Sequence, residues 1–154
     1  MKNSLLILAI LAFAACHVKR VDTTEVKKRM KDYKVRRVSD ADILYTAELW
    51  GQELKIAIIA NPQLLCDATF QIQEVKAQAL YAPFKVLDPN PKLQNLIEAY
   101  NYSSSQNLTS PDNLQQINDS TVLYTFQTKL KTAKCNPGLV LLYLPNRLIL
   151  RKIQ

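Results

Sequence analysis

The sequence contains few of the residues from which most active sites are built. Its 154 residues include two glycines, one histidine and three cysteines. Two glycines cannot supply a glycine-rich phosphate-binding loop, and one histidine excludes histidine-based metal sites, catalytic triads and most general-base schemes. Asp40 with Asp42, or Asp112 with Asp119, could form a carboxylate pair, but helix capping and loop positions are the favoured interpretation. We therefore expect a protein that is not an enzyme and that holds no metal and no cofactor.

Long apolar runs are also missing, apart from a short one at the start of the chain. Lys2 is followed by the apolar run Leu5–Leu11 and by small residues at positions 12, 14 and 15. An apolar run of about a dozen residues is too short to span a bilayer, which takes roughly 20 residues. This order of charge, apolar run and small residues is typical of a secretory signal peptide. We predict that residues 1–15 are a signal peptide.

The segment Ala14-Ala15-Cys16 resembles the lipobox of bacterial lipoproteins, in which small residues precede a cysteine that becomes acylated. Phe13 stands where these signals usually have leucine or another aliphatic residue. The alternative is ordinary cleavage after Ala14, which would leave Cys16 as a free thiol in an oxidising compartment. We predict that Cys16 is acylated and that His17 only follows the anchor. The resemblance implies a cell-envelope protein that faces the periplasm. The outer membrane is favoured because His17 is not the aspartate that marks inner-membrane retention.

Positive charge is concentrated just after this cysteine. Three acids and nine basic residues lie between positions 19 and 37, the basic ones being Lys19, Arg20, Lys27, Lys28, Arg29, Lys31, Lys34, Arg36 and Arg37. Basic residues near anionic headgroups gain roughly 1 kcal/mol each, and an acyl chain with a polybasic segment gives stable membrane attachment. We predict that residues 16–38 are a lipid anchor and a basic tether, helical around Glu25–Tyr33, that contacts the membrane surface. A solvated tether without a partner is the alternative. No nucleic acid is expected, because the chain is exported and Tyr33 is the segment's only aromatic residue.

Two further cysteines, Cys66 and Cys135, remain for the body of the chain. In an exported protein an even residual pair is typical of a disulfide. That bond would close a loop of about 70 residues and contribute roughly 4 kcal/mol in the chain-entropy model. Two separately buried thiols are the alternative.

The first part of the body has the apolar spacing of helices. Ser39 can cap a helix of about 20 residues, with Asp40 and Asp42 in its first turn. Its apolar positions, three and four residues apart, are Ile43, Ala47, Trp50, Leu54 and Ala57/Ile58. This stripe is typical of a core rather than of a cofactor pocket. We predict a second helix after Asn61-Pro62, with a face formed by Leu65, Thr69, Ile72, Val75 and Ala79.

The rest of the body changes from helical to extended patterns. A strand-like segment at 84–87 is followed by a third helix that opens at Asn90-Pro91, and by a loop from 101 to 113. We then predict strands at 121–130, 139–144 and 148–153, the first alternating and the second continuously apolar. The expected fold is α+β, with N-terminal helices followed by a C-terminal antiparallel sheet in a single domain over residues 39–154.

Several segments in this order resemble the periplasmic single-haem c-type domains of bacteria. They are "RRVSDADI", "AELWGQEL", "NPQL", "DPNP" before "LIEAY", and "STVLYTFQTKL" leading to a cysteine. The resemblance implies a PAS-like sheet packed with helices. Haem attachment in that family needs Cys-x-x-Cys-His, whereas "CNPGL" has Cys135 followed by Gly138 and Leu139 at the other two positions. The resemblance therefore implies a haem-less relative, in which Cys135 has turned to a disulfide with Cys66.

These observations favour a membrane-anchored periplasmic lipoprotein whose domain binds a partner protein or a small apolar ligand without catalysis. A redox or haem sensor related to the c-type haem domains is the alternative. A hydrolase would need a nucleophile and a base that converge in a cleft, and the sequence offers no such constellation.

Overall fold

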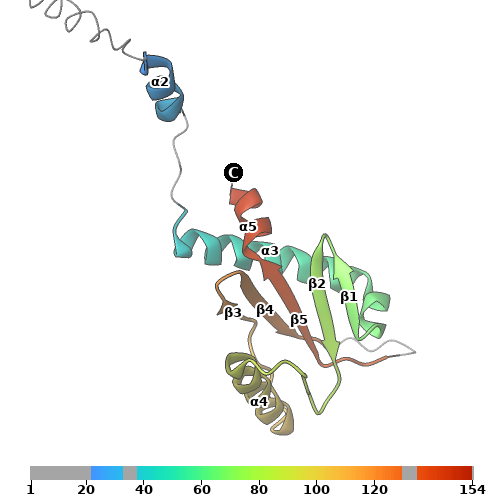
Figure 1. Cartoon of the computed structure of the whole chain (residues 1–154). Coiled ribbons are helices and arrows are strands. Elements are labelled where there is room, and N and C mark those ends of the chain that lie inside the picture. The colour runs from blue at the N-terminus through green and yellow to red at the C-terminus, as the bar shows by residue number, and fades with distance from the viewer. Residues whose placement is uncertain (1–21, 33–37, 130–134, 154) are drawn as a thin grey trace, which may run out of the picture. The chain divides into compact units, whose positions relative to one another are not determined.

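The computed structural model describes residues 22–32, 38–129 and 135–153. The chain divides into two units, 1–37 and 38–154. In the first unit, helix α2 (Thr24–Asp32) begins after Asp22, whose carboxylate accepts hydrogen bonds from the hydroxyl and the backbone N–H of Thr24. These bonds lower the pKa of Asp22. The helix begins and ends one residue before the segment expected to be helical, Glu25–Tyr33 (Figure 1).

The second unit contains one antiparallel sheet of five strands in the order β1-β2-β5-β4-β3. Its elements in chain order are α3 (Asp40–Ala60), η1 (Pro62–Cys66), β1 (Thr69–Ile72), β2 (Val75–Leu80), α4 (Pro91–Ser105), β3 (Asn113–Asn118), β4 (Thr121–Gln127), β5 (Leu139–Pro145) and α5 (Asn146–Ile153). The α+β class and the antiparallel sheet are confirmed. The order of elements is more mixed than expected, because a hairpin precedes α4 and a helix follows the sheet.

Helix α3 begins and packs as the sequence predicts. The Ser39 hydroxyl accepts a hydrogen bond from the backbone N–H of Asp42 at 3.1 Å, and the Asp42 carboxylate accepts one from the backbone N–H of Ser39 at 3.1 Å. This reciprocal capping box satisfies two backbone donors that a helix start leaves free. Trp50 and Leu54 are buried in the core, and the Trp50 indole N–H donates to Gln73 Oε1 at 3.3 Å. The capping role of Asp42 and the core role of the Trp50 stripe are confirmed.

The predicted second helix is wrong. Only the 3-10 turn η1 follows Pro62, and the chain then forms the hairpin β1–β2. Gln73 and Glu74 connect the two strands with positive φ angles of 47° and 65°, a geometry that suits the twist of a two-residue hairpin turn. The usual signal for this turn is Asn-Gly or Asp-Gly, which is missing here. In β2 the buried Val75, Ala77 and Ala79 alternate with more exposed residues, and this alternation is the signature of a strand.

The predicted closing strand at 148–153 is also wrong, because these residues form helix α5. Leu148, Ile149 and Ile153 lie on one helical face and pack against the core beneath α3. Lys152 lies on the same side, with Nζ 4.9 Å from the centre of the Trp50 ring. As a strand, the same residues would place Lys152 on one face with Leu148 and split the three apolar side chains between two faces.

Helix α4 begins as expected and extends further than expected. The Asn90 side chain accepts from the backbone N–H of Lys92 at 3.0 Å, and Pro91 occupies the first turn. The helix continues to Ser105, so the predicted loop is shorter, and its last residue, Asn113, already belongs to β3. The expected strand at 84–87 is extended chain without strand pairing.

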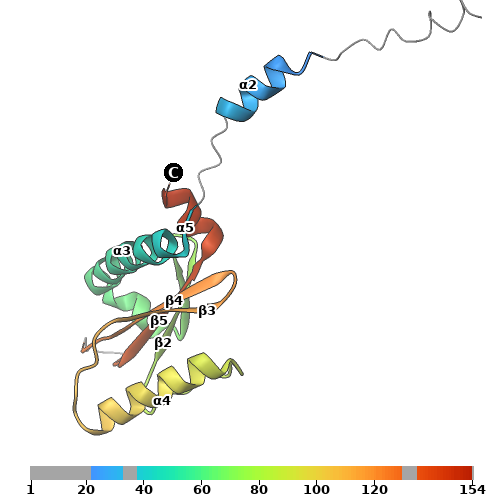
Figure 2. The same ribbon diagram turned by 90° about the vertical axis from the view of Figure 1, so that its left-hand side faces the viewer.

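The sheet lies between two layers of helices. Helices α3 and α5 cover one face, and α4 lies against the other (Figures 1 and 2). Alternate residues of β5 lie on opposite faces of the sheet. Val140, Leu142 and Leu144 are in the core under α3, and Leu141 is in the core under α4. Helix α3 lies so close to β4 that a Cβ at Gly51 would be 2.5 Å from the ring of Tyr124. Glycine at position 51 therefore permits this packing.

Candidate functional site

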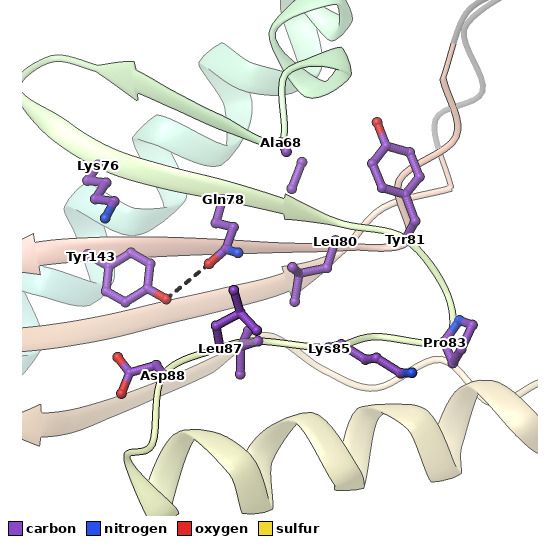
Figure 3. Close-up of a pocket in the computed structure, with 12 residues that line it drawn as sticks. Ala68, Lys76, Gln78, Leu80, Tyr81, Pro83, Lys85, Leu87, Asp88 and Tyr143 are labelled. Atoms are coloured by element: carbon purple, nitrogen blue, oxygen red, sulfur yellow. Dashed lines mark hydrogen bonds between the residues drawn. The ribbon is translucent and has the colours of Figure 1, made fainter.

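A groove lies between the sheet and the connection from β2 to α4. Its volume is about 540 Å³, within the range typical of small-molecule sites, roughly 300–1,000 Å³. The floor is formed by β2 and β5 on the sheet face that carries α4, and the wall by residues 81–88 (Figure 3). Helix α4 packs on the neighbouring part of this face, so the floor of the groove remains open.

The floor carries three polar side chains that the strand register places together. Lys76 on β2 pairs with Tyr143 on β5, and Gln78 lies two residues further along β2. The Lys76 Nζ is 6.0 Å from the centre of the Tyr143 ring, and the Tyr143 hydroxyl donates to Gln78 Oε1 at 3.3 Å (Figure 3). These positions follow from β-strand geometry, because paired residues and residues two apart lie on the same face.

The tyrosine of this floor keeps its proton at neutral pH. Burial raises the pKa of the Tyr143 phenol, and the nearby Asp88 carboxylate raises it further. A phenol with a raised pKa remains neutral at pH 7 and serves as a hydrogen-bond donor rather than as a base. The chemistry of the floor is therefore an ammonium group, a phenol and an amide that can bind a polar group.

The wall combines charged and apolar side chains on one extended segment. Lys85 and Asp88 are exposed, and Leu87 is fully exposed on the rim of the groove. Phe84 points the other way, into the core under α4. This alternation is the extended pattern that the sequence showed, here without a neighbouring strand.

Side-chain amides of α4 hold the wall in place. Asn101 binds Phe84 twice: its Oδ1 accepts from the Phe84 backbone N–H at 2.8 Å, and its Nδ2 donates to the Phe84 carbonyl at 2.9 Å. Gln94 Nε2 donates to the Asp88 carbonyl at 2.6 Å. With a longer bond from Gln94 Nε2 to the Val86 carbonyl at 3.4 Å, four hydrogen bonds to side chains of one helix fix the backbone of a segment that has no strand partner. A fixed backbone favours a preformed groove.

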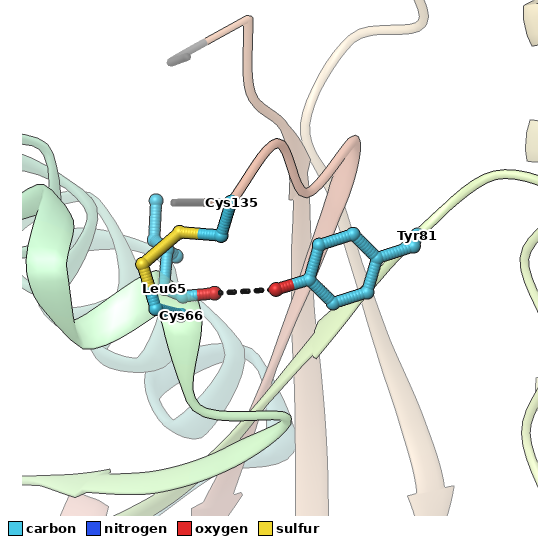
Figure 4. The surroundings of a disulfide bond; sticks show 4 residues. All are labelled: Leu65, Cys66, Tyr81 and Cys135. Atoms are coloured by element: carbon cyan, nitrogen blue, oxygen red, sulfur yellow. Dashed lines mark hydrogen bonds between the residues drawn. A yellow bond between two sulfur atoms is a disulfide. The ribbon is translucent and has the colours of Figure 1, made fainter. Parts of the chain in front are cut away.

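The disulfide joins the end of η1 to the segment before β5. Cys66 and Cys135 lie at disulfide distance, with an S–S distance of 1.99 Å and a Cα–Cα distance of 5.3 Å, as the sequence predicts for this pair (Figure 4). Next to it, the Tyr81 hydroxyl donates to the Leu65 carbonyl at 3.2 Å. Tyr81 belongs to the groove wall and Leu65 to the core under α3.

A second polar cluster lies at the edge of the core under α3. Asp112 accepts from Lys55 Nζ at 2.7 Å and from the Tyr124 hydroxyl at 2.5 Å, and Lys55 Nζ lies 5.5 Å from the centre of the Phe126 ring. Burial and the Asp112 carboxylate raise the pKa of Tyr124. The Asp112 charge is thus compensated and the phenol stays protonated. This arrangement supports a structural role for Asp112.

The sequence-predicted sites fall on both described and undescribed residues. Cys16, Lys19, Arg20, Lys34, Arg36 and Arg37 lie outside the described residues. Lys27 and Lys28 are exposed on α2, and for Arg29 and Lys31 the structure describes the helical backbone only. The groove residues Lys76, Gln78 and Tyr143 were not predicted. The alternation of apolar and polar residues in β2 could have indicated that Lys76 and Gln78 share a face. It was not used, because this segment was predicted to be a helix.

The residues that the resemblance to c-type haem domains points to do not fit a haem. Cys135 is paired with Cys66, and a Cβ at position 138 would lie 2.9 Å from the ring of Phe84. Leu139, at the position of the histidine ligand, is buried in the core under α4. Within the described residues, no three His, Cys, Asp or Glu side chains gather as a metal site, and no helix there is long and apolar enough to cross a membrane.

Comparison with known proteins adds no relative to this picture. No protein-family model matches the sequence, and neither a curated protein nor a solved structure matches it. The resemblances to bacterial lipoproteins and to PAS-like haem domains therefore stay predictions.

Proposed function

We propose that this chain is a lipid-anchored protein of the bacterial cell envelope whose domain binds an amphipathic ligand in the groove beside β2 without catalysing a reaction. The carboxylate of the ligand binds at Lys76, Gln78 and Tyr143, and its apolar part lies along the wall that carries Leu87. The carrying observation is the open floor, which presents an ammonium, a phenol and an amide opposite a fully exposed leucine.

The charges of the groove favour a carboxylate over a cationic group. Lys76 is exposed on the floor, and its Nζ lies over the Tyr143 ring. The Tyr143 hydroxyl donates to Gln78 Oε1, which leaves the amide N–H groups of Gln78 as further donors. An ammonium group is a strong partner for a carboxylate because both are charged. Lys85 adds a second positive charge along the wall, while Asp88 is the one acid that lines the groove.

The protonation state of Tyr143 favours binding over base catalysis at the floor. The raised pKa of Tyr143 keeps its phenol protonated at neutral pH. Asp88, the one carboxylate of the groove, belongs to the exposed wall and not to the floor. General base catalysis needs a group whose pKa lies near the working pH and which reaches the reacting atom. Tyr143 does not meet this condition, because burial raises its pKa.

The groove is tested with octanoate as the probe and octylamine as its control, because the two share an apolar chain and differ in charge. We expect octanoate to shift the backbone amide NMR signals of β2 and of residues 81–88, and octylamine to leave them unchanged. Lys76→Met should weaken octanoate binding by about tenfold, the effect of one lost charge-assisted hydrogen bond. Arg147→Met removes the same charge from an exposed position of α5 and should not change binding. Equal losses in both variants, or no shift with octanoate, would contradict the proposal.

The anchor is supported by the lipobox-like segment before Cys16 and by the basic residues after it, and it is tested separately. We expect the natural chain to incorporate radioactive palmitate and to sediment with membranes. Cys16→Ala should lose the label and leave most of the protein soluble. Continued labelling of Cys16→Ala would refute acylation at this residue and would leave the groove proposal unaffected.

The visible spectrum tests the alternative of a haem protein. The purified full chain, expressed in cells that mature c-type cytochromes, should show no Soret band, because Cys135 is paired and position 138 has no room for a cysteine side chain. A Soret band would refute the haem-less interpretation.

A further inference from the structure

The outward face of α3 carries an apolar stripe that nothing in the described structure covers. Tyr45, Leu49, Ile56 and Ile59 are exposed by 65%, 45%, 69% and 43%. With Gln52, which is also exposed, they follow one another at spacings of four, three, four and three residues. We call these five residues the outer stripe of α3. Their spacing is that of the seam between two helices in a coiled coil.

The opposite face of the same helix is already used by the core. Ala47, Trp50, Leu54 and Ile58 are buried against the sheet. A surface helix of a globular domain normally presents polar residues on its outer side, and a single exposed apolar residue needs no explanation. Four large apolar side chains aligned on the outer side are different, because together they form a continuous surface that a second helix can cover.

We propose that the outer stripe of α3 binds the outer stripe of a second copy of this chain in an antiparallel homodimer. The carrying observation is the position of Gln52, the only polar residue of the stripe, seven residues after Tyr45 and seven before Ile59. An amide side chain has both donors and an acceptor. A residue on the twofold axis of a symmetric dimer faces its own copy, so it must be able to bind itself. Gln52 can do so by hydrogen bonds to Gln52 of the partner subunit.

The charges beside the stripe favour the antiparallel arrangement. Glu48 and Glu53 flank the stripe on opposite sides, and Lys55 lies on the side of Glu48. In a parallel pair, Glu48 would face Glu53 of the partner subunit, a contact of like charges at both edges. In an antiparallel pair, Glu48 faces the side of the helix that carries Lys55 of the partner subunit. The other edge brings Glu53 beside Glu53 of the partner subunit, where each carboxylate already pairs with Lys152 at 3.7 Å. Asp112 already binds Lys55 at 2.7 Å, so the attraction between Glu48 and Lys55 adds little. The antiparallel arrangement is favoured because it replaces two contacts between glutamates by one.

The acids also make a membrane surface a poor occupant of the stripe. Asp42, Glu48 and Glu53 border it, and anionic headgroups repel such carboxylates. A second copy of the chain would instead place its own outer stripe, which has no charged residue, against this one. Single polar residues in such seams are known to fix register and oligomeric state.

The dimer is expected to be weak. The stripe extends over about 21 Å of helix, and one pair of helices buries an area at the low end of specific interfaces, below about 1,200 Å² in total. We expect a dissociation constant of roughly 10–100 µM for the full chain in detergent solution. If the chain is anchored at Cys16, which rests on the proposed function, confinement to a membrane raises the local concentration further.

Oxidative crosslinking of full-length single-cysteine additions tests the arrangement, with the crosslinked peptides assigned by mass spectrometry. Gln52→Cys should crosslink to itself, because residue 52 lies on the twofold axis. Tyr45→Cys and Ile59→Cys should each crosslink poorly alone and should crosslink to one another when mixed. Ala99→Cys, at an exposed position of α4, is the matched control and should not crosslink. The proposal would be overturned if Gln52→Cys crosslinked to itself no more than the Ala99→Cys control does. Efficient crosslinking of Tyr45→Cys to itself would also overturn it.

Ile56→Glu separates the dimer from other occupants of the stripe. Its side chain is exposed by 69%, so the variant should fold with an unchanged circular dichroism spectrum. We expect it to reduce the Gln52→Cys crosslink by about tenfold, because two carboxylates would be brought into an apolar seam. Retention of the crosslink, or loss of vesicle binding by Ile56→Glu in a protein that does not crosslink, would refute the homodimer.

Discussion

The two faces of the sheet are covered to different extents. On the face under α3 and α5, Val75, Ala77 and Ala79 of β2 are buried in one continuous core. On the opposite face of the same strand, Lys76 is exposed and Gln78 is partly exposed. One strand therefore contributes to a closed core on one side and to an open groove on the other.

The difference comes from the helices rather than from the sheet. Helix α3 has 21 residues and is joined by α5, whereas α4 has 15 residues and packs on the part of the sheet near Leu123, Leu139 and Leu141. The chain from 81 to 90 crosses the rest of this face as an extended segment (Figure 1). We infer that the closed face provides most of the stability and that the half-covered face is available for binding.

The largest expected effect is the loss of a leucine from the closed face. Leu142 is completely buried under α3, and Leu142→Ala should lower the free energy of unfolding by about 2–5 kcal/mol, because it leaves a cavity. Leu87→Ala on the open face should change it by less than about 0.5 kcal/mol, since Leu87 is fully exposed. Urea unfolding measures both. A loss in Leu87→Ala comparable to that in Leu142→Ala would refute the contrast between the faces.

The next effect concerns the disulfide, which joins η1 to the segment before β5. It connects residues 69 positions apart, and Cys135→Ser should lower the free energy of unfolding by roughly 2–4 kcal/mol, less than the loop-entropy value because unfolded chains keep some structure. Non-reducing mass spectrometry of the exported protein should find the Cys66–Cys135 peptide pair.

The matched control for this prediction is the partner cysteine. Cys66→Ser should lose about as much stability as Cys135→Ser, and the double variant should lose little more, because either change removes the same bond. Free alkylation of both thiols in the native oxidised protein would contradict the pairing.

Elements with complete local signals were predictable from the sequence. Ser39 with Asp42 gave the start of α3, Asn90-Pro91 gave the start of α4, and the continuous apolar run gave β5. The pairing of Cys66 with Cys135 followed from the number of cysteines in the body. In each case neighbouring residues, or composition alone, carry the information.

Elements that depend on tertiary context were not predictable. The β1–β2 hairpin turns at Gln73-Glu74, where positive φ angles are imposed on residues that do not favour them. The residues of α5 fit a strand or a helix by pattern, and the shape of the core under α3 decides for the helix. The groove was missed with the hairpin, because the helix predicted for 62–79 gave Lys76 and Gln78 no common face with Tyr143.

The smallest expected effect is on the free energy of unfolding at alkaline pH. This prediction compares one tyrosine on each face of the sheet. Folding raises the pKa of Tyr124 on the closed face and of Tyr143 on the open face, mainly by burial. The folded state therefore holds these phenol protons more tightly than the unfolded state, whose tyrosines have a pKa of about 10. Their contribution is complete below pH 10 and is lost as the pH rises from there through the folded-state pKa.

We expect the free energy of unfolding of the natural chain to fall above about pH 10. Tyr124→Phe should flatten this fall the most, because the Asp112 carboxylate accepts the Tyr124 hydrogen bond at 2.5 Å and adds to the cost of ionising the phenol. Tyr143→Phe should flatten it less, since its phenol binds the neutral Gln78 amide and borders the open groove. Urea unfolding between pH 7 and pH 11 gives the slope of the free energy of unfolding against pH for the natural chain and for each variant. The differences between these slopes isolate the contribution of each phenol, because the rest of the sequence is unchanged. Equal slopes in both variants would show that the two faces impose the same electrostatic environment on a phenol, contrary to the difference in cover described above.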